Sequence, residues 1–69
     1  MTPEIRNLAA NAVREIKRNY PPESSLNLKA LAAKLGGEPL WDPVGYFARG
    51  DRAFRDSALF SCQVIADMQ

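Results

Sequence analysis

Residues 26–37, LNLKALAAKLGG, contain a short amphipathic helix together with its start and stop signals. Asn27 suits the N-cap, where its side chain accepts a hydrogen bond from a helix N–H that has no partner within the helix. Leu26 and Leu31 occupy the two hydrophobic-staple positions around that cap, and Gly36 follows at the place where a left-handed cap needs a residue without Cβ. The segment therefore predicts a helix that is too short to be stable without packing on another element. Its apolar face comprises Leu28, Leu31, Ala32 and Leu35.

A longer amphipathic helix precedes this segment. Thr2 and Pro3 form a helix start, a hydroxyl cap followed by proline at the first helical position. Pro21 and Pro22 end the helix, because neither can continue its hydrogen-bond ladder. The two helices are joined by a stiff connector over 21–25 and are expected to form an αα-hairpin. Apolar residues recur along the first helix at steps of three and four: Ile5, Leu8, Ala9, Ala12, Val13, Ile16 and Tyr20.

The second half of the chain is expected to add one or two further helices. Asp42 and Pro43 favour the start of a short helix over 44–49, and Asp51 favours the start of a last helix over 52–68. On a helical wheel the last segment is apolar nearly all round, which is typical of a central or interface helix. The preferred prediction is therefore an all-α fold, a small bundle of three to four helices that begins with the αα-hairpin.

An α+β alternative stays open beside this prediction. Gly50 and Asp51 suit a two-residue hairpin turn between the segments 46–47 and 53–54. The apolar residues of 58–68 also alternate, as they do in a strand. This alternative has two helices followed by a C-terminal β-hairpin and is winged-helix-like.

The composition favours a binding protein over an enzyme. Sixty-nine residues with 46% hydrophobic content and a net charge of +1 fit a single small domain over 1–69. The chain has no histidine and one cysteine, Cys62, so we expect no metal site, no cofactor and no enzymatic activity. Neither a secretory signal nor an apolar run of membrane-spanning length is visible, so we expect a cytoplasmic protein without a membrane partner.

The region from Trp41 to Arg55 is the first candidate for partner binding. Trp41 and Tyr46 offer large, stiff contact area, and Arg49, Arg52 and Arg55 add planar guanidinium groups. Aromatic residues beside arginines are typical of binding hot spots. We therefore expect a small non-enzymatic regulator or inhibitor that binds another protein, a kind of domain frequent in phages and plasmids.

The second candidate is a basic stripe on the first helix, formed by Arg14, Lys17 and Arg18. Like charges four residues apart, such as those of Arg14 and Arg18, cost about a few tenths of a kcal/mol unless an anionic group offsets them. A solvated surface is the simpler interpretation of this stripe.

A homodimer is expected through the last segment. Phe60 and Val64 lie outside its broad apolar face, and together with Met68 they form the predicted dimer interface. A symmetric dimer is the commonest way to bury such a surface.

The pattern of residues 28–36 also resembles the first helix of a helix-turn-helix, with a small residue at Ala32 and a turn at Gly36. This resemblance implies DNA as the alternative partner, contacted by residues 28–49 of a transcriptional regulator. Two prolines and two acidic residues within 38–43 are unfavourable beside phosphate, and the net charge is low for a nucleic-acid-binding domain. DNA binding is therefore the alternative and not the preferred function.

Overall fold

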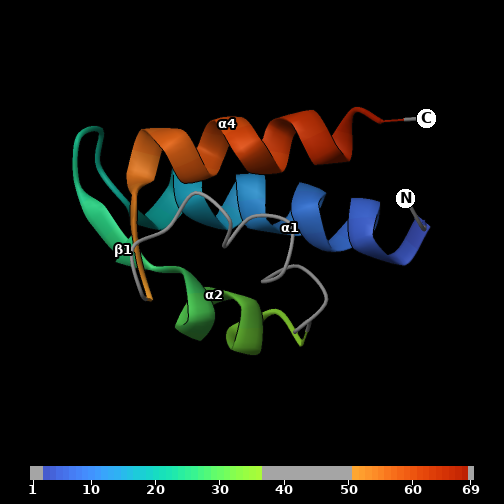
Figure 1. The fold of residues 1–69 in the computed structure, drawn as a ribbon, viewed down its shortest axis with the longest axis horizontal. Helices are drawn as coiled ribbons and strands as arrows, with labels where there is room; N and C mark the ends of the chain where they lie inside the picture. The colour runs from blue at the N-terminus through green and yellow to red at the C-terminus, as the bar shows by residue number, and fades with distance from the viewer. Residues whose placement is uncertain (1–2, 37–50, 69) are drawn as a thin grey trace.

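Two long antiparallel helices form the frame of the molecule (Figure 1). The computed structural model describes residues 3–36 and 51–68. Arg6 Nη1 donates a hydrogen bond of 3.0 Å to the Met68 carbonyl, which joins the start of the first helix to the end of the last. The elements follow in the order α1 (Pro3–Asn19), β1 (Ser25–Asn27), α2 (Leu28–Lys34), β2 (Arg52–Phe54) and α4 (Arg55–Ala66).

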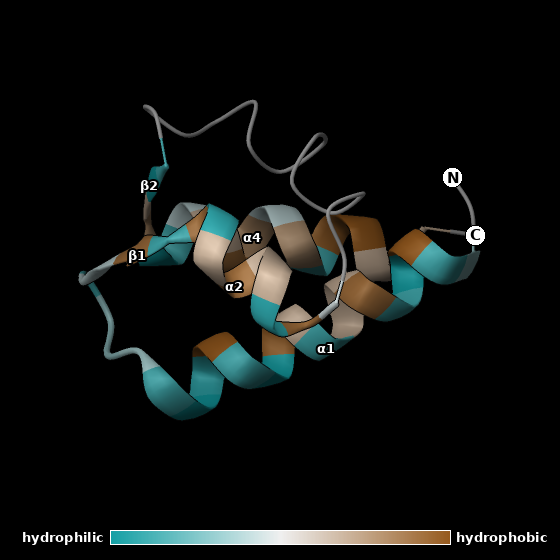
Figure 2. Ribbon diagram, turned by 90° about the horizontal axis from the view of Figure 1, so that it is seen from below, coloured by the Kyte–Doolittle hydropathy of each residue, from teal (hydrophilic) through white to brown (hydrophobic). Residues whose placement is uncertain are grey.

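The core lies where α1, α2 and α4 meet, and its buried side chains are apolar throughout the described residues. α1 packs chiefly against α4, while hydrophilic residues cover the outer side of α1 (Figure 2). This arrangement follows from the apolar periodicity of α1, which places one stripe of the helix against its neighbours. The core residues are Ala9, Ala12, Val13 and Ile16 of α1, Leu28, Leu31 and Ala32 of α2, Ala58, Cys62 and Ile65 of α4, and Leu26 and Ala53 of the strands.

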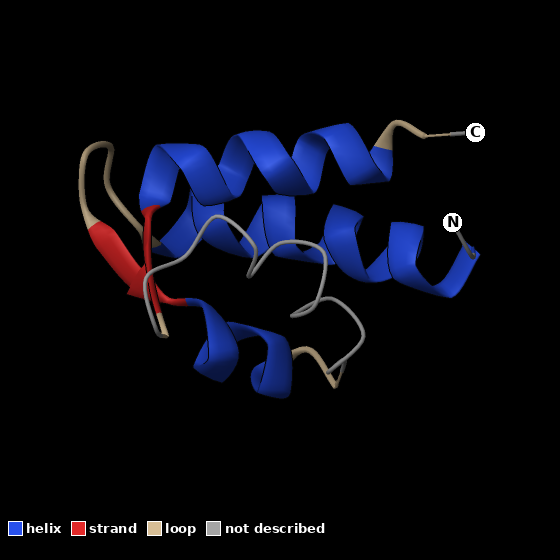
Figure 3. Cartoon of the chain, viewed as in Figure 1, coloured by secondary structure: helices blue, strands red, loops and turns tan. Residues whose placement is uncertain are grey.

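A short antiparallel pair of strands, β1 and β2, stands at one end of the helix pair (Figure 3). Leu26 pairs with Ala53, and both side chains face the core. The Leu28 N–H donates to the Asp51 carbonyl at 2.8 Å, and the Arg55 N–H donates to the Ser24 carbonyl at 2.8 Å. These bonds extend the strand pairing to the start of α2 at one end and to the start of α4 at the other.

The end signals of α2 are confirmed. The Asn27 side chain accepts a hydrogen bond of 2.9 Å from the Ala30 N–H, as expected of an N-cap. Gly36 has φ +78°, a left-handed conformation that a side chain disfavours. Its N–H donates to the Ala33 carbonyl at 3.0 Å and so satisfies a carbonyl at the helix end.

The all-α prediction is wrong, because the chain is mostly helical but carries a small two-stranded antiparallel sheet within its described residues. The α+β alternative fits this coarse description. The αα-hairpin is also corrected, since β1 intervenes between the first two helices and the main partner of α1 is α4. Residues 46–47, half of the expected hairpin, and the expected helix over 44–49 lie outside the described residues.

The last helix begins later than expected. Residues 52–54 pair with β1, so the helix starts at Arg55 and not at Arg52. The N-cap of this helix is Phe54 and not the expected Asp51, and Phe54 makes no side-chain capping bond. The alternating apolar pattern over 58–68 does not form a strand, because α4 continues to Ala66.

Candidate functional site

A line of apolar side chains is exposed along the outer side of α4. Phe60 is 71% exposed, Val64 43% and Met68 45%. We call these three residues the α4 stripe. Because they follow one another at steps of four, they share one side of the helix and extend over about 12 Å. Large apolar side chains gathered in this way on a small protein are typical of an interaction surface.

The stripe extends past the end of the helix itself. Met68 lies two residues beyond Ala66, but the chain is still turning there. The Asp67 N–H donates to the Gln63 carbonyl at 3.0 Å, and the Met68 N–H donates to the Ile65 carbonyl at 3.2 Å. These two bonds continue the turn of α4 as far as the Met68 N–H.

The opposite side of α4 is buried, which sets the orientation of the stripe. Ala58 and Cys62 are 2% and 0% exposed, and both belong to the core. The α4 stripe therefore cannot turn inward without removing these residues from the core. Its exposure follows from the packing of α4 and does not depend on the rotamer of any one side chain.

The two edges of the stripe differ in chemistry. At 100° per residue, Gln63 and Asp67 fall on one side of it and Ser61 on the other, while Asp56 lies one step of four before Phe60. The Gln63 amide donates to Asp67 Oδ1 at 3.0 Å. The last turn of α4 contains no basic residue.

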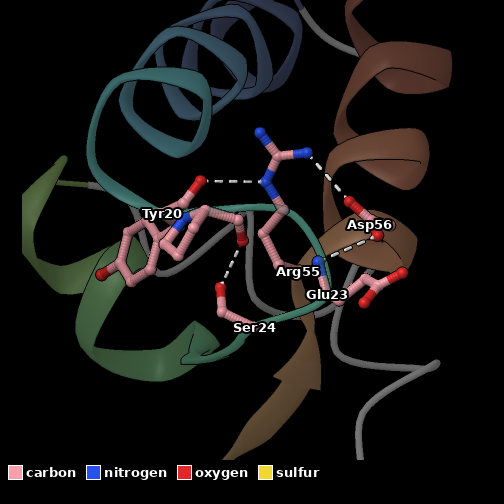
Figure 4. Close-up of polar contacts among 6 residues, drawn as sticks. Tyr20, Glu23, Ser24, Arg55 and Asp56 are labelled. Atoms are coloured by element: carbon pink, nitrogen blue, oxygen red, sulfur yellow. Dashed lines mark hydrogen bonds and ion pairs between the residues drawn. The ribbon is translucent and has the colours of Figure 1, made fainter.

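Arg55 lies inside the fold, at the junction of α1 and α4 (Figure 4). Its side chain is 12% exposed. Its Nε donates to the Tyr20 carbonyl at 3.2 Å, and its Nη1 lies 2.9 Å from Asp56 Oδ1. The guanidinium therefore links the end of α1 to the first turn of α4.

Asp56 also holds the turn that follows α1. Glu23 has φ +66°, a left-handed conformation that is uncommon for a residue with a side chain. Its N–H donates to Asp56 Oδ2 at 3.3 Å, and Ser24 Oγ donates to the Pro21 carbonyl at 2.7 Å. Asp56 thus connects this turn to Arg55 (Figure 4).

The first candidate for partner binding is only partly described. Trp41, Tyr46 and Arg49 lie outside the described residues. Arg52 is exposed on β2, where it pairs with Asn27, whereas Arg55 is largely buried and bonded within the chain. The structure does not present Arg52 and Arg55 as one row, because a strand ends and a helix begins between them. Their role in binding stays a prediction.

The basic stripe of Arg14, Lys17 and Arg18 is exposed along the outer side of α1. Arg14 donates to the side chain of its neighbour Asn11. Lys17 and Arg18 occupy the last turn, where positive charge is favourable beside the carbonyl end of a helix. These contacts give the stripe a structural explanation, so it adds no argument for a ligand.

Cys62 is unsuited to nucleophilic chemistry. The residue is fully buried, and burial raises the pKa of its thiol to about 11. Because the thiolate is the reactive form, this thiol is inert near neutral pH. Within residues 3–36 and 51–68, no cluster of three or more His, Cys, Asp or Glu side chains is arranged for a metal ion.

No helix in the described parts of the chain combines the length and apolarity that a membrane crossing requires. Comparisons with protein-family models, curated proteins and solved structures find no match for this chain. Sequence reasoning identified the three residues of the α4 stripe. The helical wheel also gives Asp56, Gln63 and Asp67 as the main polar strip of the last helix, but sequence reasoning assigned this strip no role in binding.

Proposed function

We propose that this protein is a small non-enzymatic binding module that acts as a regulator or inhibitor by docking on another protein through the α4 stripe. The observation that carries the proposal is the exposure of Phe60, Val64 and Met68 in one line on a helix whose other side is buried. Burial of apolar area gives about 25 cal/mol per Å², so such a line contributes binding energy wherever a partner covers it.

The α4 stripe is a different surface from the region around Trp41, which the sequence favours as the binding site. Of that region only residues 51–55 are described, and Arg55 is occupied by contacts within the chain. DNA binding through 28–49 rests on residues of which 37–49 are outside the description, and no described contact favours it. Partner binding around Trp41 and DNA binding both remain predictions, and neither rests on a contact between described residues.

Photo-crosslinking in the native host tests the proposed surface. A photoreactive phenylalanine analogue replaces Phe60, and the same analogue at Phe54 serves as the matched control, since Phe54 is 51% exposed on β2. We expect a defined crosslinked product from position 60 and none of that size from position 54.

The same experiment is repeated with Val64→Asp, which introduces charge in the middle of the stripe. We expect loss of the crosslinked product while circular dichroism remains that of the wild type, because Val64 is 43% exposed and not part of the core. The proposal fails if position 60 gives no specific product, or if Val64→Asp leaves the product unchanged in a folded chain.

A further inference from the structure

At the C-terminal end of α4, the Asp67 carboxylate has no ion-pair partner among residues 3–36 and 51–68. A helix ends with partly negative carbonyl groups, and cations are favourable there. The last turn of α4 has no basic residue, and Asp67 adds a carboxylate at the same end. Within the described residues Asp67 accepts a hydrogen bond from the neutral Gln63 amide, and no ion pair reaches it.

The neighbouring basic side chains do not pair with Asp67. Arg6 approaches this end of the helix, but its Nη1 donates to the Met68 carbonyl and not to Asp67. Within Arg55–Ala66, Arg55 is the single basic residue of α4. It lies at the opposite end of the helix, where it contacts Tyr20 and Asp56. Asp56 therefore has an ion-pair partner, and Asp67 has none within the described residues.

A residue that is locally unfavourable indicates a role that local stability does not explain. Asp67 places a carboxylate at the carbonyl end of the helix, where the helix dipole disfavours negative charge. It also lies next to Met68, so the uncompensated charge borders the apolar stripe. A partner that covers Met68 and brings a cation to Asp67 would remove both unfavourable features together.

The shape of the stripe favours a helix as the occupant. Residues spaced by four form a ridge on a helix surface, and such ridges pack into the grooves of a second helix. The stripe is a single straight ridge of Phe60, Val64 and Met68, which matches a helix in a side-by-side contact.

We infer that the α4 stripe binds a basic amphipathic helix of another protein, whose apolar residues cover Phe60, Val64 and Met68 and whose Lys or Arg side chain pairs with Asp67. This inference rests on the proposed function and adds the chemistry of the partner. An ion pair at the rim of such a contact is screened by solvent, so it selects the partner and sets its orientation more than it supplies the affinity.

A second copy of this chain fits the charges less well. Its own α4 brings the same Asp67, while its Arg55 is largely buried. In a two-fold antiparallel pairing of α4 helices, the acidic edges of both copies fall on the same side of the contact. The exposed cations of α1 belong to a face with no large exposed apolar side chain among its described residues. Neither α1 nor α4 of a second copy thus offers apolar surface and cations on one face. Arg52 and Phe54 share an exposed face of β2, but a strand of three residues does not match the helical ridge of the stripe.

Two synthetic helical peptides test the inference. Both carry leucines at spacings of three and four, and they differ only in lysine or glutamate beside those leucines. Each peptide carries fluorescein, and binding to the full chain is followed by fluorescence anisotropy. We expect the lysine peptide to bind at least fivefold more tightly than the glutamate peptide, with a preference that shrinks as salt is added.

Variants link the preference to the proposed residues. Val64→Asp should weaken the lysine peptide at least tenfold. Asp67→Lys should reverse the preference between the two peptides, and it keeps the fold because lysine is favourable at this end of a helix. The matched control is Asp51→Lys, the same change at an exposed acid outside α4, which should leave the preference unchanged.

The outcomes separate this inference from the proposed function. Equal binding of both peptides, or an Asp51→Lys effect as large as that of Asp67→Lys, overturns the basic partner while photo-crosslinking at Phe60 still supports a docking surface. A crosslinked product of twice the chain mass assigns the stripe to a second copy and also overturns the inference. Loss of the crosslink itself rejects the proposed function.

Discussion

Replacing Arg55 by Met removes the charged link between α1 and α4 while keeping most of the apolar stem. The wild-type guanidinium donates to the Tyr20 carbonyl at 3.2 Å and lies 2.9 Å from Asp56 Oδ1, on a side chain that is 12% exposed. Asp56 in turn accepts the N–H of Glu23 at 3.3 Å. One substitution therefore weakens three contacts that join the helix ends and the turn between α1 and β1.

The expected loss of stability is moderate and measurable. A hydrogen bond from a charged donor contributes about 1.5–3 kcal/mol, and an ion pair to a partly exposed carboxylate about 0–1 kcal/mol. Burying the Arg55 charge costs desolvation free energy in the wild type, so its removal offsets part of this loss. We expect the Arg55→Met variant to be less stable by about 2 kcal/mol, which for a domain of this size lowers Tm by about 8–16 °C.

Thermal unfolding followed by circular dichroism, together with urea titration, measures this change. Arg52→Met is the matched control, since Arg52 is exposed on β2 only three residues earlier. Its stability should stay within about 0.5 kcal/mol of the wild type. Equal shifts for the two variants, or a shift for Arg55→Met below about 4 °C, would refute the structural role assigned to Arg55.

Three further predictions concern local features of the fold. Asn27→Ala should destabilise the domain by about 1 kcal/mol in urea titrations, and Asn27→Asp should not, because the N-cap needs a side-chain oxygen. Cys62 should resist thiol reagents at pH 8 in the folded chain and react in urea, since burial raises its pKa to about 11; rapid reaction of the folded chain would contradict its buried place. The ion pair between Lys34 and Glu15 lowers the pKa of Glu15 below its usual 4.5. This pair should therefore stabilise the fold at pH values above the pKa that Glu15 has in the unfolded chain. The stabilisation should be lost as the pH falls through the lowered pKa that Glu15 has in the folded chain. The stability difference between wild type and Glu15→Gln at pH 7 should vanish near pH 2.

Local sequence signals determined the first two helices. The apolar periodicity before Pro21 predicts α1, and Asn27 and Gly36 predict both ends of α2, because a cap needs only residues within one turn of the helix end. The helical wheel likewise placed Phe60 and Val64 outside the buried side of α4, since that side depends on spacing alone.

Tertiary structure alone decided which distant segments meet. β1 and β2 have three residues each, too few for a periodic pattern, and the pairing of Leu26 with Ala53 joins positions far apart in the chain. That pairing moves the start of α4 to Arg55 and turns Arg55 toward Tyr20, so an arginine predicted to bind a partner holds the fold together. Contacts of this kind depend on the packing of the whole chain, which single-sequence periodicity does not contain.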